Sequence, residues 1–159
     1  MITLSFTPDK ERDIPHQATK AIARNQINLE SVSVTDLRYG YFDYPTVFRV
    51  GAQSFISYPT PIVDLMYCLA LCVREIPVGG ESDIDFTENS YVIRFVQSGG
   101  FLEITSSAGG YATCPADLFY TEARKFIYAG ISHIAAEYPV LQRHAAFREI
   151  KRIAGIQLS

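Results

Sequence analysis

The 159-residue sequence contains no tryptophan, only three cysteines and three histidines, and no long hydrophobic run. Its most apolar stretch, IVDLMYCLALCV (62–73), spans about 12 residues and includes an aspartate, which is too short to cross the roughly 30 Å hydrocarbon core of a bilayer. Three cysteines cannot all pair within one chain, and their spacing matches no disulfide framework. The first residues, MITLSFTPDKERD, lack the basic segment and longer apolar segment of a signal peptide. We therefore expect a cytoplasmic protein that does not enter a membrane.

The composition is that of a folded domain. Hydrophobic residues make up 48% of the chain and charged residues 19%, and 159 residues are enough for one domain (1–159) with a buried core. Ten tyrosines and ten phenylalanines predict an aromatic core in which the tyrosine hydroxyls stay near water. The net charge of −3 disfavours general nucleic-acid binding.

Patterns of apolar residues predict the strands. We expect a strand over 2–6, a long loop or a frayed turn of helix over 8–25, and a bulged strand or two short strands over 27–34. An aromatic connection follows over 36–45, and then a hairpin that joins 46–50 to 53–58. Segment 83–107 predicts three strands, with turns at Glu88-Asn89 and from Ser98 to Gly100.

Three helices are predicted after the hairpin. The first begins at Thr60 and Pro61 and runs to about Glu75, because Pro77 and the following glycines stop it. It is apolar nearly all round, so we expect it between layers of the structure. The second begins near Pro115 and buries a stripe that consists of Phe119, Ala123, Phe126, Ile127, Gly130, Ile134 and Tyr138. Pro139 ends it, and the third helix runs to Gly155. The predicted fold class is α+β, a mainly antiparallel sheet with three helices packed on one face.

Spacings typical of catalytic and metal sites are missing. No His or Cys pair has metal-finger spacing, and the sequence has neither HExxH nor a glycine-rich phosphate motif. Cys68 and Cys72 share one helix face, where two buried cysteines behave as small hydrophobic residues. Ser132 and His133 are adjacent in the middle of a helix and point about 100° apart, so they cannot act as a nucleophile and base. We expect no catalytic centre, no metal and no cofactor.

Two charged features remain. Glu81, Asp83 and Asp85 alternate along one strand and therefore share a face. Three interpretations of this row stay open: the solvated side of an edge strand, an acid/base or cation site, or a docking surface for a basic partner. The segment of the last helix carries a group of basic residues: Arg143, His144, Arg148, Lys151 and Arg152. We interpret this group as a solvated helix face, and nucleic-acid binding is the second interpretation.

Three segments carry a resemblance to a known class of proteins. They are SYPTPIVDLMYCL, DFTENSYVIRFVQSGGFLEITSS and EYPVLQRHAAF, within residues 57–147. In the order of elements that they predict, the chain resembles the small bacterial immunity proteins of polymorphic toxin and contact-dependent inhibition systems. The resemblance implies a protein without activity of its own, which binds a cognate toxin and blocks its active site or its access to substrate.

The resulting hypothesis is a non-enzymatic protein-binding domain, an immunity protein that neutralises a basic, nuclease-type toxin. A mildly acidic surface with exposed tyrosines suits such a partner through charge complementarity and aromatic anchors. The candidate partner-binding residues are Glu81, Asp83 and Asp85, together with Tyr39, Tyr41, Asp43 and Tyr44 of the expected loop YGYFDY. The alternative hypothesis is a small-ligand-binding or hydrolytic domain that uses Asp83, Asp85 and a histidine in a pocket.

Overall fold

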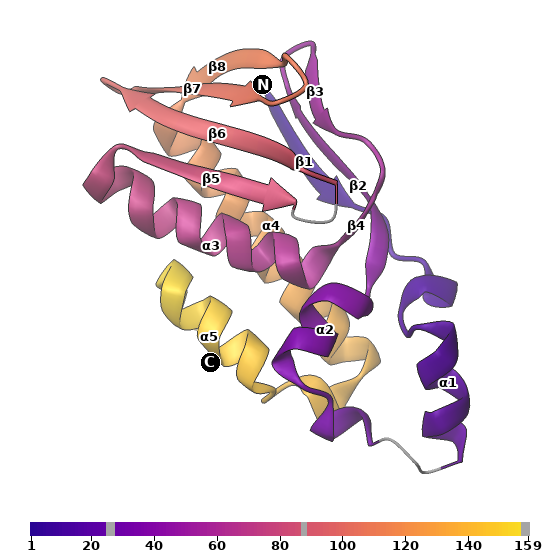
Figure 1. The fold of residues 1–159 in the computed structure, drawn as a ribbon. Coiled ribbons are helices and arrows are strands. Elements are labelled where there is room, and N and C mark those ends of the chain that lie inside the picture. Colours follow the sequence, from indigo (N-terminus) through magenta and orange to yellow (C-terminus); the bar gives the residue numbers. More distant parts are fainter. Residues whose placement is uncertain (25–27, 87–88, 157–159) are drawn as a thin grey trace.

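The protein forms two four-stranded antiparallel sheets in a computed structural model that describes residues 1–24, 28–86 and 89–156 (Figure 1). The first sheet has the order β1-β2-β3, with β4 also paired to β2, and its strands are β1 (Ile2–Phe6), β2 (Asp43–Val50), β3 (Gln53–Ile56) and β4 (Pro59–Pro61). The second sheet has the order β5-β6-β7-β8, and its strands are β5 (Glu81–Phe86), β6 (Tyr91–Ser98), β7 (Phe101–Ser106) and β8 (Tyr111–Pro115).

The described residues also form five α-helices and three short 3-10 helices. The α-helices are α1 (His16–Ala23), α2 (Val34–Gly40), α3 (Ile62–Gly79), α4 (Ala116–Glu137) and α5 (Ala145–Ala154). The 3-10 helices are η1 (Lys10–Arg12), η2 (Leu29–Ser31) and η3 (Pro139–Leu141). The predicted α+β class is confirmed, whereas the predicted single sheet with three helices is corrected to two sheets and five α-helices.

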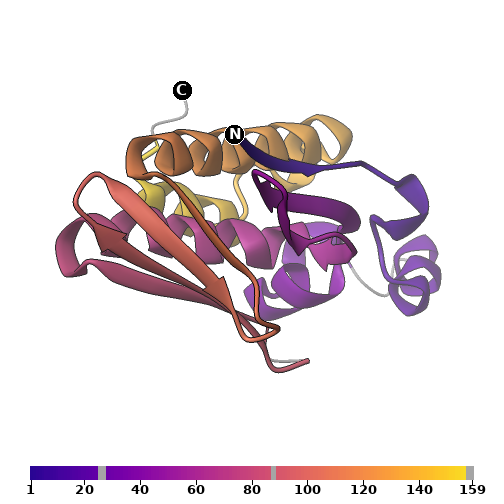
Figure 2. The same cartoon turned by 90° about the horizontal axis from the view of Figure 1, so that it is seen from above.

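Helix α3 lies at the centre of the molecule. Twelve of its 18 residues are buried, because β5, α4 and α5 pack around it. Seen from above, α3 lies between the second sheet and α4 (Figure 2). This arrangement confirms that a helix apolar on nearly all sides lies between layers.

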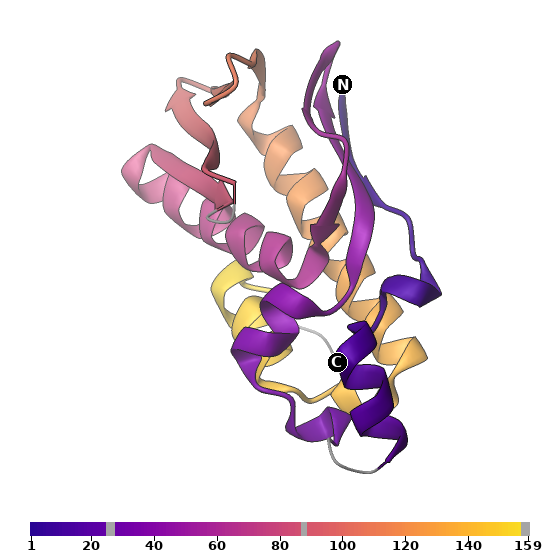
Figure 3. The ribbon, with the colours of Figure 1, turned by 45° about the vertical axis from the view of Figure 1, so that its right-hand side comes forward.

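The two sheets and the start of α4 share one aromatic core. Phe48 of β2 stacks on Phe95 of β6 with ring centroids 6.3 Å apart, and Phe95 lies 4.7 Å from Phe119 of α4. The Tyr91 hydroxyl of β6 also donates a hydrogen bond to the Phe55 carbonyl of β3 at 2.7 Å. The sheets therefore flank α3 and α4 and are joined through the core between them (Figure 3).

The break at Pro139 is confirmed. Helix α4 ends at Glu137, η3 follows, and α5 ends at Gly155, which has the left-handed φ of 67°. The predicted stripe of α4 is buried from Phe119 to Ile134, and Tyr138 is half-buried.

Several boundaries in the first half of the chain differ from the prediction. The segment over 8–25, expected as a long loop or a frayed turn of helix, contains η1 and α1. The described part of the segment expected as a bulged strand or two short strands over 27–34 contains no strand; it holds η2 and the first residue of α2. Ser33 caps α2, because its Oγ accepts a hydrogen bond from the Asp36 amide at 3.0 Å. The alternation of Val32 and Val34 suggested a strand, but the Ser-x-x-Asp cap determines the local structure.

Helix α3 also differs at both ends. Thr60 does not cap it; its hydroxyl donates to the Tyr58 carbonyl at 3.2 Å, and Pro61 is the residue before the first turn. The helix continues through Pro77 to Gly79, since a proline this close to the end costs a single internal hydrogen bond. Gly80 ends it at φ 81° and donates to the Ile76 carbonyl. The predicted turn at Glu88-Asn89 lies partly outside the described residues.

Candidate partner-binding surface

The acidic row on β5 is exposed as predicted. Side chains of a strand alternate between two faces, and here Glu81, Asp83 and Asp85 are exposed while the residues between them are buried against the helices. Strand β5 is also an edge strand, because β6 is its sole neighbour in the sheet. The row therefore lies along one edge of the second sheet, on its outer face.

One arginine lies beside this row. Arg94 of β6 is opposite Asp83 in the register, and its Nη2 pairs with the Glu81 carboxylate at 3.0 Å. Within the described part of the chain, Asp83 and Asp85 form no ion pair. The row therefore keeps an excess of negative charge.

Tyr39 is exposed and is brought near the end of the acidic strand. It lines a pocket of about 120 Å³ together with Tyr58 and with Phe86, the last residue of β5. The other described residues around this pocket are Pro59, Thr60, Pro61, Asp64 and Asn89. The structure therefore places one predicted tyrosine at the end of β5, in a pocket with a largely aromatic and proline lining, although Phe86 projects to the face of the strand opposite the acidic row.

The carboxylate of this pocket has a cationic partner within the chain. Arg38 Nε lies 2.7 Å from Asp64 Oδ1, and the guanidinium stacks over the rings of Tyr39 and Tyr67. Burial alone would lower the pKa of Arg38, but its hydrogen bond to Asp64 and the charge of Asp64 raise the pKa above its usual value. The pair is charged but neutral overall, so the pocket does not extend the acidic row.

Two of the predicted tyrosine anchors are not on the surface. Tyr41 and Tyr44 are buried, and the expected aromatic loop is the end of α2 followed by the start of β2. Along β2 the buried positions alternate from Tyr44 to Val50, so Tyr44 belongs to the core face of that strand. The prediction that Tyr41 and Tyr44 are exposed anchors is wrong.

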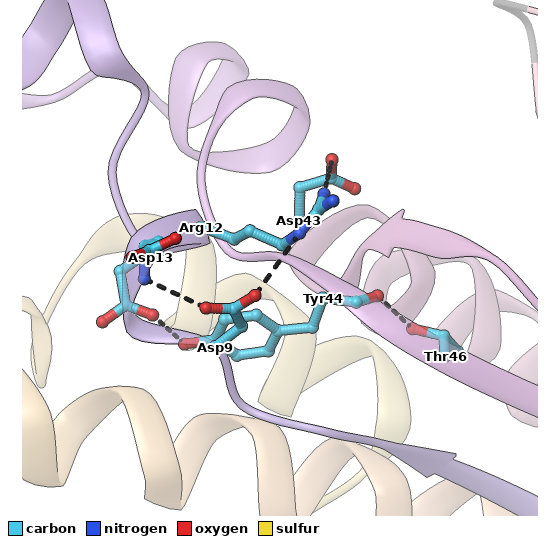
Figure 4. A network of polar contacts seen from close by, with 7 residues as sticks. Asp9, Arg12, Asp13, Asp43, Tyr44 and Thr46 are labelled. Atoms are coloured by element: carbon cyan, nitrogen blue, oxygen red, sulfur yellow. Dashed lines mark hydrogen bonds and ion pairs between the residues drawn. The ribbon is translucent and has the colours of Figure 1, made fainter.

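Tyr44 instead belongs to a buried network around Asp13 (Figure 4). The carboxylate of Asp13, which is 2% exposed, accepts hydrogen bonds from the hydroxyls of Tyr44 and Tyr138, the latter at 2.7 Å. The Asp13 carbonyl accepts from the Phe42 amide at 3.0 Å. Three segments that are distant in the sequence therefore meet at one carboxylate, and no sequence pattern predicts this meeting.

The network favours neutral tyrosines. Burial and the hydrogen bond to Asp13 raise the pKa of Tyr44 and of Tyr138 above the usual value for tyrosine. The Tyr44 proton points to Asp13, so His133, whose Nε2 lies 3.3 Å from the Tyr44 oxygen, donates to that oxygen. His133 therefore has a buried phenol as its hydrogen-bond partner.

Asp43 is half-exposed and lies in a separate ion-pair group. Its Oδ2 is 3.4 Å from Arg12 Nη1, and Arg12 Nε is 3.5 Å from Asp9 (Figure 4). These contacts hold η1 against the start of β2. Asp43 is therefore already paired within the chain, unlike Asp83 and Asp85.

The other candidate groups have structural contacts. His144 caps α5 by accepting from the Ala146 amide through Nδ1, and its Nε2 donates to the Val32 carbonyl at 2.6 Å. Cys68 and Cys72 are buried, and burial raises the pKa of each thiol to about 12. Among the described residues, no group of three or more His, Cys, Asp or Glu side chains is placed to hold a metal ion.

The hydrolytic alternative required Asp83 or Asp85 beside a histidine. Strand β5 packs on β6 and α3, whereas His133 contacts Tyr44 and Phe6 of the first sheet and His144 lies at the start of α5. The structure therefore does not bring either aspartate together with His133 or His144. Among the basic side chains at this end of the chain, Arg148 and Arg152 of α5 are exposed and Lys151 is half-buried, and Arg143, which precedes the helix, is exposed.

Comparisons with models of known families, with curated proteins and with solved structures gave no match to this chain. Over residues 1–24, 28–86 and 89–156, no helix is both long enough and apolar enough to cross a membrane.

Proposed function

We propose that the protein is a non-enzymatic binding domain, an immunity protein that acts in the cytoplasm by binding and neutralising a basic, nuclease-type toxin. The observation that carries the proposal is the exposed row of Glu81, Asp83 and Asp85 on an edge strand. The exposed Tyr39 lies beside the end of this strand. The buried Tyr41 and Tyr44 and the paired Asp43 have no part in the proposed interface.

Charge complementarity is the physical basis of the proposal. Like charges in a row on a strand destabilise it slightly, and here Arg94 neutralises one of the three carboxylates. A basic partner gains Coulomb attraction from the remaining two before contact, which raises the rate of association. That attraction is screened over a Debye length of about 10 Å at 0.1 M salt. Fast, salt-sensitive association is therefore expected of the complex.

The first test is protection of a cell. The product of the neighbouring gene would be expressed in a heterologous bacterium, with and without this protein. The proposal predicts that growth stops with the neighbouring gene alone and recovers when both proteins are made. Absence of both protection and binding would overturn the proposed function.

The second test measures association rates with that gene product at about 0.02 M and about 0.2 M salt. The variant Asp83→Lys/Asp85→Lys should associate at least about tenfold more slowly at low salt and should show a weaker salt dependence. The matched control is Glu30→Lys/Glu137→Lys, which reverses two exposed carboxylates away from β5. Each reversal changes the net charge by two, so both variants raise it by four, and only the position of the change differs. Equal rates for the two variants would exclude the acidic row from the interface.

A further inference from the structure

The outer face of the second sheet carries every charged side chain of β5 to β8. In the strand register, Glu81 is opposite Val96, Val96 is opposite Glu103, and Asp83 is opposite Arg94. Because opposite residues in a sheet project to the same face, Glu103 of β7 lies on the same surface as the acidic row. Four carboxylates and one guanidinium therefore share this face: Glu81, Asp83, Asp85, Glu103 and Arg94.

Aromatic side chains lie on the same face, toward β7 and β8. Phe101 and Tyr111 are each 56% exposed. Phe101 is opposite Pro115, and Tyr111 is opposite Thr105. Val92 and Val96 of β6 are half-buried between these strands and the acidic row. The surface is thus acidic along β5, whereas along β6 to β8 apolar and aromatic side chains alternate with Arg94 and Glu103, and Glu103 lies between Phe101 and Tyr111 in the register.

The two faces of this sheet differ in what packs on them. Helix α3 packs on the inner face through β5 and β6, and Phe119 of α4 packs on Phe95 from the same side. None of the described elements packs on the outer face, where Phe101 and Tyr111 are exposed. A face that combines exposed aromatic rings and valines with charged side chains offers both the apolar anchors and the polar contacts of a protein interface.

We infer that a basic protein covers this whole outer face, with apolar contacts at Val96, Phe101 and Tyr111 and with lysine or arginine side chains at the four carboxylates between and beside them. The inference rests on the proposed function and names the surface and the chemistry of its partner. Charge selects that chemistry, since four carboxylates share the face with a single arginine, which is itself paired with Glu81.

The size of the face sets the extent of the contact. Four strands about 4.8 Å apart and about six residues long cover on the order of 300 Å², compared with the roughly 800 Å² that each partner buries in a standard interface. The sheet face is therefore the centre of the contact, and the partner also extends over its rim.

The test compares three variants in binding to the product of the neighbouring gene. Phe101→Ser and Tyr111→Ser remove exposed aromatic rings from the sheet face, and Tyr128→Ser is the matched control. Tyr128 lies on α4 outside the sheet and is 54% exposed, so the control removes a ring of similar exposure. A thermal melt of each variant should match the wild type, because none of the three rings is buried.

The inference predicts at least about a tenfold loss of affinity for Phe101→Ser and for Tyr111→Ser, mainly through faster dissociation. Tyr128→Ser should bind within about twofold of the wild type. If the wild type binds and protects, but both sheet variants bind as tightly as the control, the inference is wrong and the proposed function stands. If the wild type itself does not bind, the proposed function fails and this inference fails with it.

Discussion

Replacement of Asp13 by asparagine should strongly destabilise the protein. The Asp13 carboxylate is 2% exposed and accepts hydrogen bonds from two tyrosine hydroxyls, on Oδ1 from Tyr44 and on Oδ2 from Tyr138. The asparagine side chain has nearly the same shape, but its NH₂ group can only donate. One hydroxyl therefore loses its acceptor, and the other retains a bond to a neutral oxygen.

The magnitude follows from those two bonds. A hydrogen bond to a charged group contributes about 1.5–3 kcal/mol, and a neutral one about 1 kcal/mol. Loss of one charged bond and weakening of the other should lower the free energy of unfolding by about 2–4 kcal/mol. Tyr138→Phe removes a single bond at a half-buried site and should cost about 1–2 kcal/mol. In the double variant the two losses should not add, because Asp13 and Tyr138 share one interaction.

Urea denaturation followed by circular dichroism at pH 7 measures these differences. Asp43→Asn is the matched control, since it makes the same chemical change at a half-exposed carboxylate that pairs with Arg12 at 3.4 Å. An exposed ion pair contributes about 0–1 kcal/mol, so this control should lose less than about 1 kcal/mol. Equal losses for Asp13→Asn and Asp43→Asn would refute the assignment of Asp13 as a buried structural anchor.

Three further predictions follow from side chains in the core and at a helix cap. The raised pKa values of Tyr44 and Tyr138 mean that the folded state keeps protons which the unfolded state releases above about pH 10. Below that pH the contribution of these groups to the free energy of unfolding should not change with pH. Above it the free energy of unfolding should fall, less steeply when both are phenylalanine, as measured by urea denaturation between pH 8 and pH 11. The Cys68 and Cys72 thiols are buried and have pKa values of about 12. At pH 8 they should therefore react with a disulfide reagent about a hundredfold more slowly in the folded protein than in urea. A fast reaction of either thiol in the folded protein would contradict its burial. His144→Ala should cost about 1–2 kcal/mol in the same denaturation assay, because it removes the α5 cap and leaves a carbonyl without its donor. The control variant Arg143→Ala, at the exposed residue before His144, should lower the free energy of unfolding by less than about 0.5 kcal/mol.

The elements that the sequence predicted well are those with strong local signals. The hairpin around Gly51, the three strands over 83–107 and the break at Pro139 each combine a clear periodicity with glycine or proline at the boundary. Alternation also placed Glu81, Asp83 and Asp85 on one exposed face, since that inference needs only the strand itself.

The errors arose where the local signal was divided or absent. Alternation from Tyr44 to Val50 could have extended β2 back to the buried Tyr44, but Pro45 and the surrounding aromatic residues suggested a loop. Asp13 could not be found at all, because its partners Tyr44 and Tyr138 lie 31 and 125 positions away and it directly follows a run of charged residues typical of a solvated segment. The outer face of the second sheet likewise could not be predicted from single strands. Only the pairing of β5, β6 and β7 shows that Glu103 lies on the same face as the acidic row.

Carboxyl footprinting tests the central claim most directly. A carbodiimide with an amine nucleophile would label exposed acids of the free protein and of its complex with the neighbouring gene product, and mass spectrometry would read the sites. We expect the complex to protect the four carboxylates of the outer sheet face: Glu81, Asp83, Asp85 and Glu103. Glu30 and Glu137, which are exposed elsewhere, should be labelled equally in both states. A complex in which all six acids are labelled as in the free protein would contradict the claim that this face binds the partner.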